Sequence, residues 1–181
     1  MCGKPVVLDA DGLNLLSVHE EWKRFLGENV IVTPHIGEMS RLCGKAIGDI
    51  QDCLTQTASD YAKETNAVCV LKDACTVIAD ASGEMYLNLS GNAGMATAGS
   101  GDVLSGVLAG ILCMYLAQKK KPSPVMMAAL GVYIHGAAGD LAAQVVGQGG
   151  MTAGDIIRFL PDILKSEGGH LRSSWYYIHV G

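Results

Sequence analysis

The sequence predicts an α/β domain with a mostly parallel central sheet. Short apolar runs alternate along the chain with longer segments in which apolar residues recur at helical spacing. The first two runs, Val6–Leu8 and Val30–Val32, each stop at a polar or proline-containing turn. Strands buried on both faces of a parallel sheet are nearly continuous in apolar residues, and helices connect them. The observed alternation is typical of that arrangement.

Each expected element follows from its local pattern. Apolar runs bounded by turn residues give the expected strands, which are Val6–Leu8, Val30–Val32, Ala67–Leu71, Thr76–Ala79 and Met85–Leu89. Helical periodicity gives the expected helices, which are Glu20–Leu26, Gly37–Leu42, Ile47–Thr65, Asp102–Ala117, Val125–Val146 and Ile156–Leu164. The DADGLN segment after the first strand is expected to form a turn. Trp175–Val180 is either an added edge strand or part of a flexible end.

Two details define the start and course of the last helix. Thr152 and Asp155 have the Ser/Thr-x-x-acid spacing of an N-terminal helix cap. Pro161 is expected to shorten or kink the helix, because proline lacks a backbone N–H.

Composition limits the classes of function. A chain of 181 residues with 49 % hydrophobic residues can bury the core of one folded domain. Its net charge of −5 argues against a nucleic-acid partner, which needs a basic surface. The six cysteines contain no CxxC pair, which favours reduced thiols in a cytoplasmic protein. The first residues lack the apolar segment of a signal peptide.

The two most apolar segments do not indicate a membrane partner. Val103–Ala117 is shorter than the roughly 20 residues that span the hydrocarbon of a bilayer. Val125–Val146 is long enough, but it contains His135 and Asp140. Both segments are therefore expected to be buried core helices.

The stretch NAGMATAGSGDVLSG, residues 92–106, contains a single formal charge, Asp102. A glycine-rich turn that enters a helix leaves free N–H groups, whose dipoles attract an anion such as a phosphate. Asp102 is either a helix cap, which stabilises by about 1 kcal/mol, or a base that accepts a hydroxyl proton. Spacing alone leaves both interpretations open.

Other polar residues follow the remaining strands. His35 and Glu38 come after the second strand, Lys72 after the third, and Asp9 and Asp11 after the first. Ligands of open parallel sheets bind beyond the carboxyl ends of strands, so these residues are candidates for one site. Each also has a structural alternative: a hydrogen-bonding histidine, a glutamate favouring a helix start, a solvated lysine, and turn-forming aspartates.

Five motifs together resemble one enzyme family. They are LDADGLNLL (8–16), TPHIGEMSRL (33–42), VLKDACTVIA (70–79), GNAGMATAGSGDVLSGVLAGILC (91–113) and GVYIHGAAGDLAA (131–143). In this order they resemble the ADP/ATP-dependent NAD(P)H-hydrate dehydratases of the ribokinase-like superfamily. The resemblance implies a ribokinase-like three-layer sandwich. It also implies that ADP or ATP drives loss of water from hydrated NADH or NADPH, by phosphoryl transfer to the hydroxyl and elimination of phosphate.

The resemblance also implies roles for individual residues. Asp102 is the expected catalytic base, and His35 and Asp102 are the expected contacts to the hydrated dinucleotide. The expected nucleotide contacts are Lys72, Asp73, Ala74, Cys75, Thr76 and Gly101. The expected anion hole is formed by Gly99, Ser100 and Gly101. Glu38 is the expected link, through water, to Mg²⁺. Asp73 replaces the glycine that usually follows the lysine, which places a carboxylate near phosphate.

The resemblance covers residues 4–164, and the family domain has a substantial portion before the strand that is Val6–Leu8 here. We therefore expect residues 1–167 to be a ribokinase-like domain without its N-terminal part, and residues 168–181 to be a tail of unknown structure. A homo-oligomer is expected, because a truncated domain exposes apolar surface. Two alternatives are a ribokinase-like small-molecule kinase and an inactive nucleotide-binding fragment.

Overall fold

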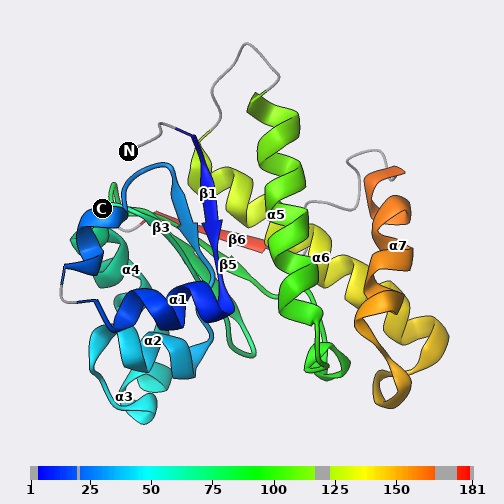
Figure 1. Ribbon diagram of the computed structural model, residues 1–181. Helices are drawn as coiled ribbons and strands as arrows, with labels where there is room; N and C mark the ends of the chain where they lie inside the picture. The colour runs from blue at the N-terminus through cyan, green and yellow to red at the C-terminus, as the bar shows by residue number, and fades with distance from the viewer. Residues whose placement is uncertain (1–3, 20, 117–122, 166–174, 180–181) are drawn as a thin grey trace.

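A six-stranded sheet separates two layers of helices (Figure 1). The computed structural model describes residues 4–19, 21–116, 123–165 and 175–179. The strands are β1 (Val6–Leu8), β2 (Val30–Val32), β3 (Val68–Leu71), β4 (Thr76–Ala79), β5 (Glu84–Asn88) and β6 (Trp175–His179). Their order across the sheet is the same as their order in the chain.

The sheet has a parallel part and an antiparallel part. β1, β2 and β3 pair in parallel, and β3 to β6 form successive antiparallel pairs. β1, β2, β3 and β5 therefore run in one direction, which confirms the mostly parallel sheet expected from the sequence. Of the two possibilities for the C-terminal segment, the structure has the added edge strand, β6, beside β5.

Two groups of helices cover the two faces of the sheet. One face carries α1 (Ala10–Ser17), α2 (Ile36–Cys43), α3 (Ile47–Asp52) and α4 (Leu54–Thr65), with the 3₁₀ turn η1 (Trp22–Phe25). The other face carries α5 (Ser100–Leu116) and α6 (Pro124–Val146), against which α7 (Ala153–Lys165) packs. The 3₁₀ turns η2 (Ala93–Met95) and η3 (Gln148–Gly150) lie in the connecting loops.

Alternation along β2 shows how the strands serve both layers. Val30 and Val32 belong to the core under α1–α4, while Ile31 between them belongs to the core under α5 and α6. A strand buried on both faces must be apolar throughout, which is why three consecutive β-branched residues occur here.

Helix α6 is the one described helix whose length and composition would allow it to cross a membrane. In this fold 72 % of its apolar segment is buried. It contacts β3, β4 and β5 on one side and α5 and α7 on the others. Its apolar surface is therefore used in packing, as expected.

The structure corrects three details of the expected elements. The DADGLN segment is not a turn but the first part of α1, because burial of Leu13 in the core outweighs the turn preference of Asp, Gly and Asn. The expected helix 47–65 is divided at Cys53, whose backbone leaves the helical region (φ −136°, ψ 46°). Helix α7 continues through Pro161, where it forgoes one backbone hydrogen bond.

Candidate active site at the carboxyl ends of the parallel strands

A partly buried ion pair joins the ends of β1 and β3. Lys72 Nζ lies 3.0 Å from Asp9 Oδ1, and the side chains are 22 % and 12 % exposed. The second carboxylate oxygen of Asp9 accepts a hydrogen bond of 2.8 Å from Ser105 Oγ on α5. Three elements that are distant in the sequence therefore meet at one carboxylate.

The surroundings of Asp9 favour its ionised form. Burial alone would raise its pKa, but the charge of Lys72 and side-chain hydrogen bonds with Thr33, Ser105 and Lys72 outweigh burial and hold the pKa below its usual value. Asp9 also precedes α1 without making a side-chain cap to that helix. Its carboxylate is directed to the site instead.

Helix α5 presents its N-terminus to this ion pair. Gly99 precedes the helix with φ +85°, a conformation that glycine adopts readily, and a Cβ there would lie 3.3 Å from Ala153 Cβ. The N–H of Val103 donates to the Gly99 carbonyl oxygen at 3.1 Å, so the N–H groups of Gly101 and Asp102 precede the first helical hydrogen bond. They form the open, positive end of the helix dipole.

Gly101 lies directly beside the ion pair. A Cβ built on Gly101 would be 3.6 Å from both Lys72 Nζ and Asp9 Oδ2. Asp102, the next residue, is exposed in the first turn of α5. The structure thus brings together Gly101, Asp102 and Lys72, three of the residues expected at the site.

Ser100 is turned towards the interior. Its N–H donates to the Thr97 carbonyl oxygen at 3.2 Å, and its Oγ lies 3.4 Å from Nε2 of the buried His135 on α6. Burial, opposed by a hydrogen bond to the backbone of Ser100 and assisted by the charge of Lys72, lowers the pKa of His135 to about 4. His135 is therefore neutral near pH 7, and Ser100 contributes to the support of the loop.

His35 and Glu38 form the N-terminal cap of α2. His35 Nδ1 accepts hydrogen bonds from the N–H groups of Gly37 and Glu38, at 2.9 and 3.3 Å. Glu38 Oε2 accepts from the His35 N–H at 2.8 Å, which completes a capping box. With Nδ1 acting as an acceptor, the neutral imidazole carries its proton on Nε2.

The cap also positions His35 next to the other strand ends. The backbone of His35 forms an isolated parallel bridge with Lys72, and the Lys72 N–H donates to the Pro34 carbonyl oxygen at 2.9 Å. The His35 side chain is 55 % exposed and can reach a ligand, whereas that of Glu38 is 6 % exposed.

The expected nucleotide-binding segment connects β3 to β4. Asp73 and Ala74 are exposed, Cys75 is partly buried, and Thr76 is the first residue of β4. The hairpin therefore begins at the ion-paired Lys72 and extends away from the sheet. Asp73 stands at its exposed turn.

Asp140 on α6 holds the loop that leads into α5. Its two oxygens accept from the Gly91 N–H at 2.9 Å and from Asn92 Nδ2 at 3.0 Å. The Asn92 side chain in turn accepts from the Gly94 N–H at 3.0 Å. Gly136 on the same helix allows this close approach, since a Cβ there would be 2.2 Å from Ser90 Oγ.

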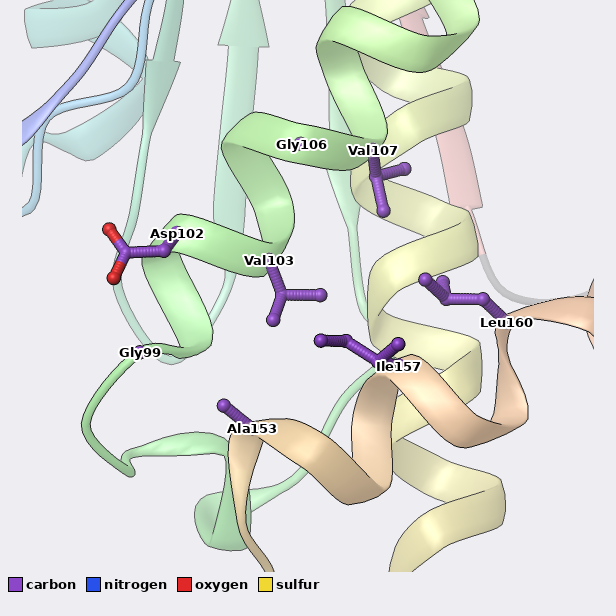
Figure 2. Close-up of a pocket in the computed structure, with 8 residues that line it drawn as sticks. All are labelled: Gly99, Asp102, Val103, Gly106, Val107, Ala153, Ile157 and Leu160. Atoms are coloured by element: carbon purple, nitrogen blue, oxygen red, sulfur yellow. The ribbon is translucent and has the colours of Figure 1, made fainter.

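A largely apolar groove of about 470 Å³ lies beside the N-terminal half of α5. It is lined by Gly99, Asp102, Val103, Gly106, Val107, Ala153, Ile157 and Leu160, from α5, the residue before it and α7. Figure 2 shows the apolar side chains gathered between the two helices, with the Asp102 carboxylate pointing away from them. The carboxylate and the groove thus lie on different sides of the same helical turn.

Several supporting residues were not identified from the sequence. Ser105 was not singled out, His135 and Asp140 counted only against a membrane helix, and Asp9 stayed ambiguous. Their spacing gives no signal, because their partners are distant in the chain. The signal that remained was their chemical type, since polar side chains within apolar segments require partners.

Within the part of the chain that the structure describes, no group of three or more His, Cys, Asp or Glu side chains forms a ready metal site. A Mg²⁺ ion at a nucleotide site is usually held by phosphates and water with one or two carboxylates, so it needs no such group. Glu38, the carboxylate expected to reach Mg²⁺ through water, is 6 % exposed and accepts from the His35 N–H at 2.8 Å.

A family model described as NAD(P)H-hydrate dehydratase matches residues 2–162. The chain belongs to this family. It is 48 % identical over 164 residues to the bifunctional NAD(P)H-hydrate repair enzyme of Moorella thermoacetica, covering 90 % of this chain and 29 % of that protein. It is 41 % identical over 157 residues to the ADP-dependent (S)-NAD(P)H-hydrate dehydratase of Neisseria meningitidis, covering 84 % and 51 %.

A solved structure has the same fold. It is the ADP/ATP-dependent NAD(P)H-hydrate dehydratase of Bacillus subtilis, co-crystallised with ATP and Mg²⁺ and soaked with coenzyme A. The TM-score is 0.74 at 30 % identity, over 89 % of this chain and 56 % of that chain. The ribokinase-like α/β fold expected from the sequence is confirmed. The chain spans about half the length of these two dehydratases.

Proposed function

We propose that the protein acts in ADP- or ATP-dependent dehydration of hydrated NADH and NADPH. The observation that carries the proposal is the position of the Lys72 ammonium, beside Gly101 in the open first turn of α5, with Asp102 next in the chain. An ammonium beside free N–H groups, with a carboxylate on the next residue of the helix, supplies components that phosphoryl transfer requires.

In the proposed reaction, Asp102 accepts the proton of the substrate hydroxyl. The hydroxyl oxygen then bonds to the terminal phosphorus of the nucleotide, whose bond to the bridging oxygen breaks. Phosphate next leaves with the electrons of its carbon–oxygen bond, and loss of a proton from the adjacent carbon forms the double bond of NADH or NADPH. The first turn of α5 and Lys72 stabilise the charge that develops on the transferred group.

The nucleotide is assigned to the region between Lys72 and the apolar groove. Lys72 and the 73–76 hairpin are proposed to contact its phosphates, together with the N–H of Gly101. The groove between α5 and α7 is wide and apolar enough for a flat base. When bound, Mg²⁺ would neutralise phosphate charge, with Glu38 proposed to contact it through water.

The hydrated dinucleotide is assigned to the side of α5 that faces the strand ends. The His35 side chain is exposed, with its Nε2 3.5 Å from Glu38 Oε1, and the Asp102 carboxylate points away from the groove (Figure 2). We propose that the anion approaches the backbone at Gly99 and Gly101, where no side chain intervenes, and that the inward-facing Ser100 side chain does not contact it. A cytoplasmic location and a homo-oligomeric state stay predictions; the described cysteines are all free thiols.

The test is to incubate the purified chain with hydrated NADH, Mg²⁺ and either ADP or ATP, while following recovery of NADH absorbance. We expect recovery that depends on nucleotide, and about a 10³-fold lower kcat in Asp102→Asn, because a general base is lost. ADP affinity, measured by calorimetry, is expected to change little. Asp162→Asn on the exposed surface of α7 is the matched control and retains activity.

Three results would contradict the proposal. Phosphate transfer to an alcohol without NADH recovery would indicate a small-molecule kinase. ADP binding without turnover would indicate a nucleotide-binding protein. Near wild-type kcat in Asp102→Asn would exclude Asp102 as the base.

A further inference from the structure

Asp9 has both carboxylate oxygens occupied by groups of the site. Oδ1 pairs with Lys72 at 3.0 Å, and Oδ2 accepts from Ser105 Oγ at 2.8 Å. Lys72 follows β3 and Ser105 lies in α5, and they are separated from Asp9 by 63 and 96 residues. A carboxylate held at both oxygens has a fixed orientation, and the group that it pairs with is fixed as well.

Lys72 requires such a partner. Its backbone is held by the Pro34 carbonyl oxygen and by the bridge to His35, but its side chain has a flexible four-carbon stem. A lysine side chain carries about 2 kcal/mol of rotamer entropy, which an unpaired ammonium retains. In this structure the ammonium is directed to a single position, beside the first turn of α5.

That position coincides with the proposed phosphoryl site. Asp9 Oδ2 and Lys72 Nζ are equally distant, at 3.6 Å, from a Cβ built on Gly101. A carboxylate so close to an anion site weakens anion binding by repulsion. The Asp9 carboxylate has a physical reason to lie there if it holds the Lys72 ammonium beside the N-terminus of α5.

We propose that Asp9 is a positioning residue, which holds the Lys72 ammonium in place for the transferred phosphoryl group. Asp9 contributes through Lys72 and does not itself bind the nucleotide. Ser105 contributes by fixing the carboxylate. The inference rests on the proposed function, and it assigns a role to a residue that does not belong to the nucleotide-binding segment 72–76.

The expected signature is a split between binding and turnover. In Asp9→Asn the repulsive charge is removed and the shape is kept, so ADP binds as tightly as in the wild type or more tightly. The ammonium is no longer held, so kcat falls by about 10- to 100-fold. Calorimetry measures the first effect and NADH recovery the second.

A double-mutant cycle with Lys72→Met identifies the route of the effect. If Asp9 acts on turnover through Lys72, then Asp9→Asn does not lower kcat further in the Lys72→Met background, whereas removal of its repulsive charge still leaves ADP affinity unchanged or higher. An equal loss in both backgrounds, or weaker ADP binding in Asp9→Asn, would overturn the proposal. Ser105→Ala gives the same split with a smaller amplitude, and it replaces Asp9→Asn if that variant does not fold.

One measurement is independent of nucleotide and of turnover. Carboxyl-carbon NMR follows the titration of Asp9 in the wild type and in Lys72→Met. Asp9 faces Lys72 from β3, Thr33 after β2 and Ser105 from α5, and Asp102 is the other carboxylate of that helical turn. The pKa of Asp9 is expected to rise in Lys72→Met; no change would refute the contact even if the chain proves not to be a dehydratase.

Discussion

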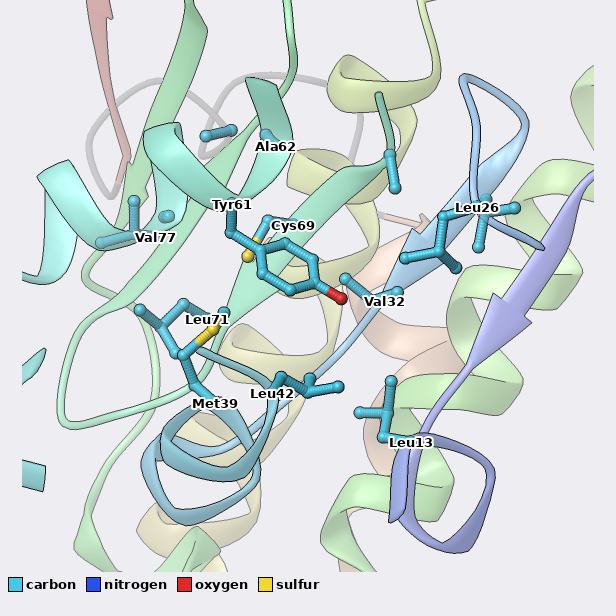
Figure 3. Packing of buried hydrophobic residues seen from close by; sticks show 14 of the residues in the cluster. Leu13, Leu26, Val32, Met39, Leu42, Tyr61, Ala62, Cys69, Leu71 and Val77 are labelled. Carbon is cyan, nitrogen blue, oxygen red and sulfur yellow. The ribbon is translucent and has the colours of Figure 1, made fainter. Parts of the chain in front are cut away.

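Two polar side chains in different parts of the fold are partnered differently: Asp9 at the strand ends and Tyr61 under α1–α4. At the strand ends, Asp9 has a partner for each oxygen and a pKa held below its usual value by Lys72 and hydrogen bonds that outweigh burial. Under α1–α4, the Tyr61 hydroxyl is buried and has no hydrogen-bond partner among the described residues. Figure 3 shows it directed towards Val32, within the apolar cluster.

The difference shows where this fold tolerates an unsatisfied group. The ring of Tyr61 stacks on Trp22 with a centroid distance of 5.9 Å, and its burial fills the core. Burial raises the pKa of Tyr61, so its hydroxyl stays neutral and costs less than an unpaired charge would. Ionised groups receive partners near the site, while a neutral orphan is accepted in the packing core.

The largest expected effect is a loss of folding stability at acid pH, caused by the buried His135 beside the site. His135 has a folded-state pKa of about 4, against an ordinary value of 6.5. Between these values the unfolded chain binds the proton and the folded chain does not, so stability falls as pH falls from 6.5 towards 4. The full loss is about 3 kcal/mol.

Urea unfolding at pH 7 and pH 4.5 measures this effect. His135→Gln is expected to lose most of the pH dependence in this window, whereas Tyr61→Phe keeps that of the wild type. A His135→Gln variant with unchanged pH dependence would show that His135 titrates normally in the folded protein. Asp9 adds its own loss of stability only at lower pH, as the pH falls through its lowered pKa.

A smaller loss of stability is expected when a methyl group is added where α6 contacts the loop that leads into α5. The Cβ of Gly136→Ala would lie 2.2 Å from Ser90 Oγ and 2.8 Å from the Ser90 carbonyl carbon and oxygen. The loop must move, at a cost of about 2 kcal/mol. Gly110→Ala in α5 is the matched control: its Cβ meets nothing within 4 Å, so it stabilises by about 0.5–1 kcal/mol.

Thermal unfolding of both glycine variants measures the difference. Equal melting temperatures for Gly136→Ala and the wild type would show that the loop adapts without cost. In that case the support of the α5 N-terminus by α6 would be weaker than the contact distances indicate.

The smallest effect is expected at the orphan hydroxyl. Tyr61→Phe removes a buried oxygen without a partner, so we expect stability to be unchanged or to rise by at most about 1 kcal/mol. Tyr86→Phe is the contrast, because its hydroxyl donates to Glu84 Oε1 at 2.5 Å. That variant is expected to lose about 1 kcal/mol in urea unfolding. A large loss in Tyr61→Phe would mean that its hydroxyl has a partner after all.

The sequence predicted some elements exactly and others not at all, for identifiable reasons. Val6–Leu8 and Val30–Val32 are strands with the predicted bounds, because an apolar run between turn residues has few other interpretations. Helix α1 was missed because Asp, Gly and Asn favour turns locally, while the burial of Leu13 that decides the matter is a tertiary contact.

For the candidate site, residue type and family resemblance indicated Lys72, Gly101 and Asp102, and the structure places them together. The role of Asp9 could not be derived from the sequence, because a turn-forming aspartate and an ion-paired one look the same without their partners. The role of Ser100 in the anion hole stays a prediction; its N–H donates to the Thr97 carbonyl oxygen and its hydroxyl lies 3.4 Å from His135 Nε2.

The order of strands across the sheet has a consequence for synthesis of the chain. Because each strand from β1 to β6 lies beside the one made just before it, pairing can keep pace with emergence from the ribosome. Ser105 reaches Asp9 across 96 residues, so the pocket is completed only after most of the sheet exists. This strand order therefore allows β1 to β5 to pair before the candidate site at Asp9 is complete.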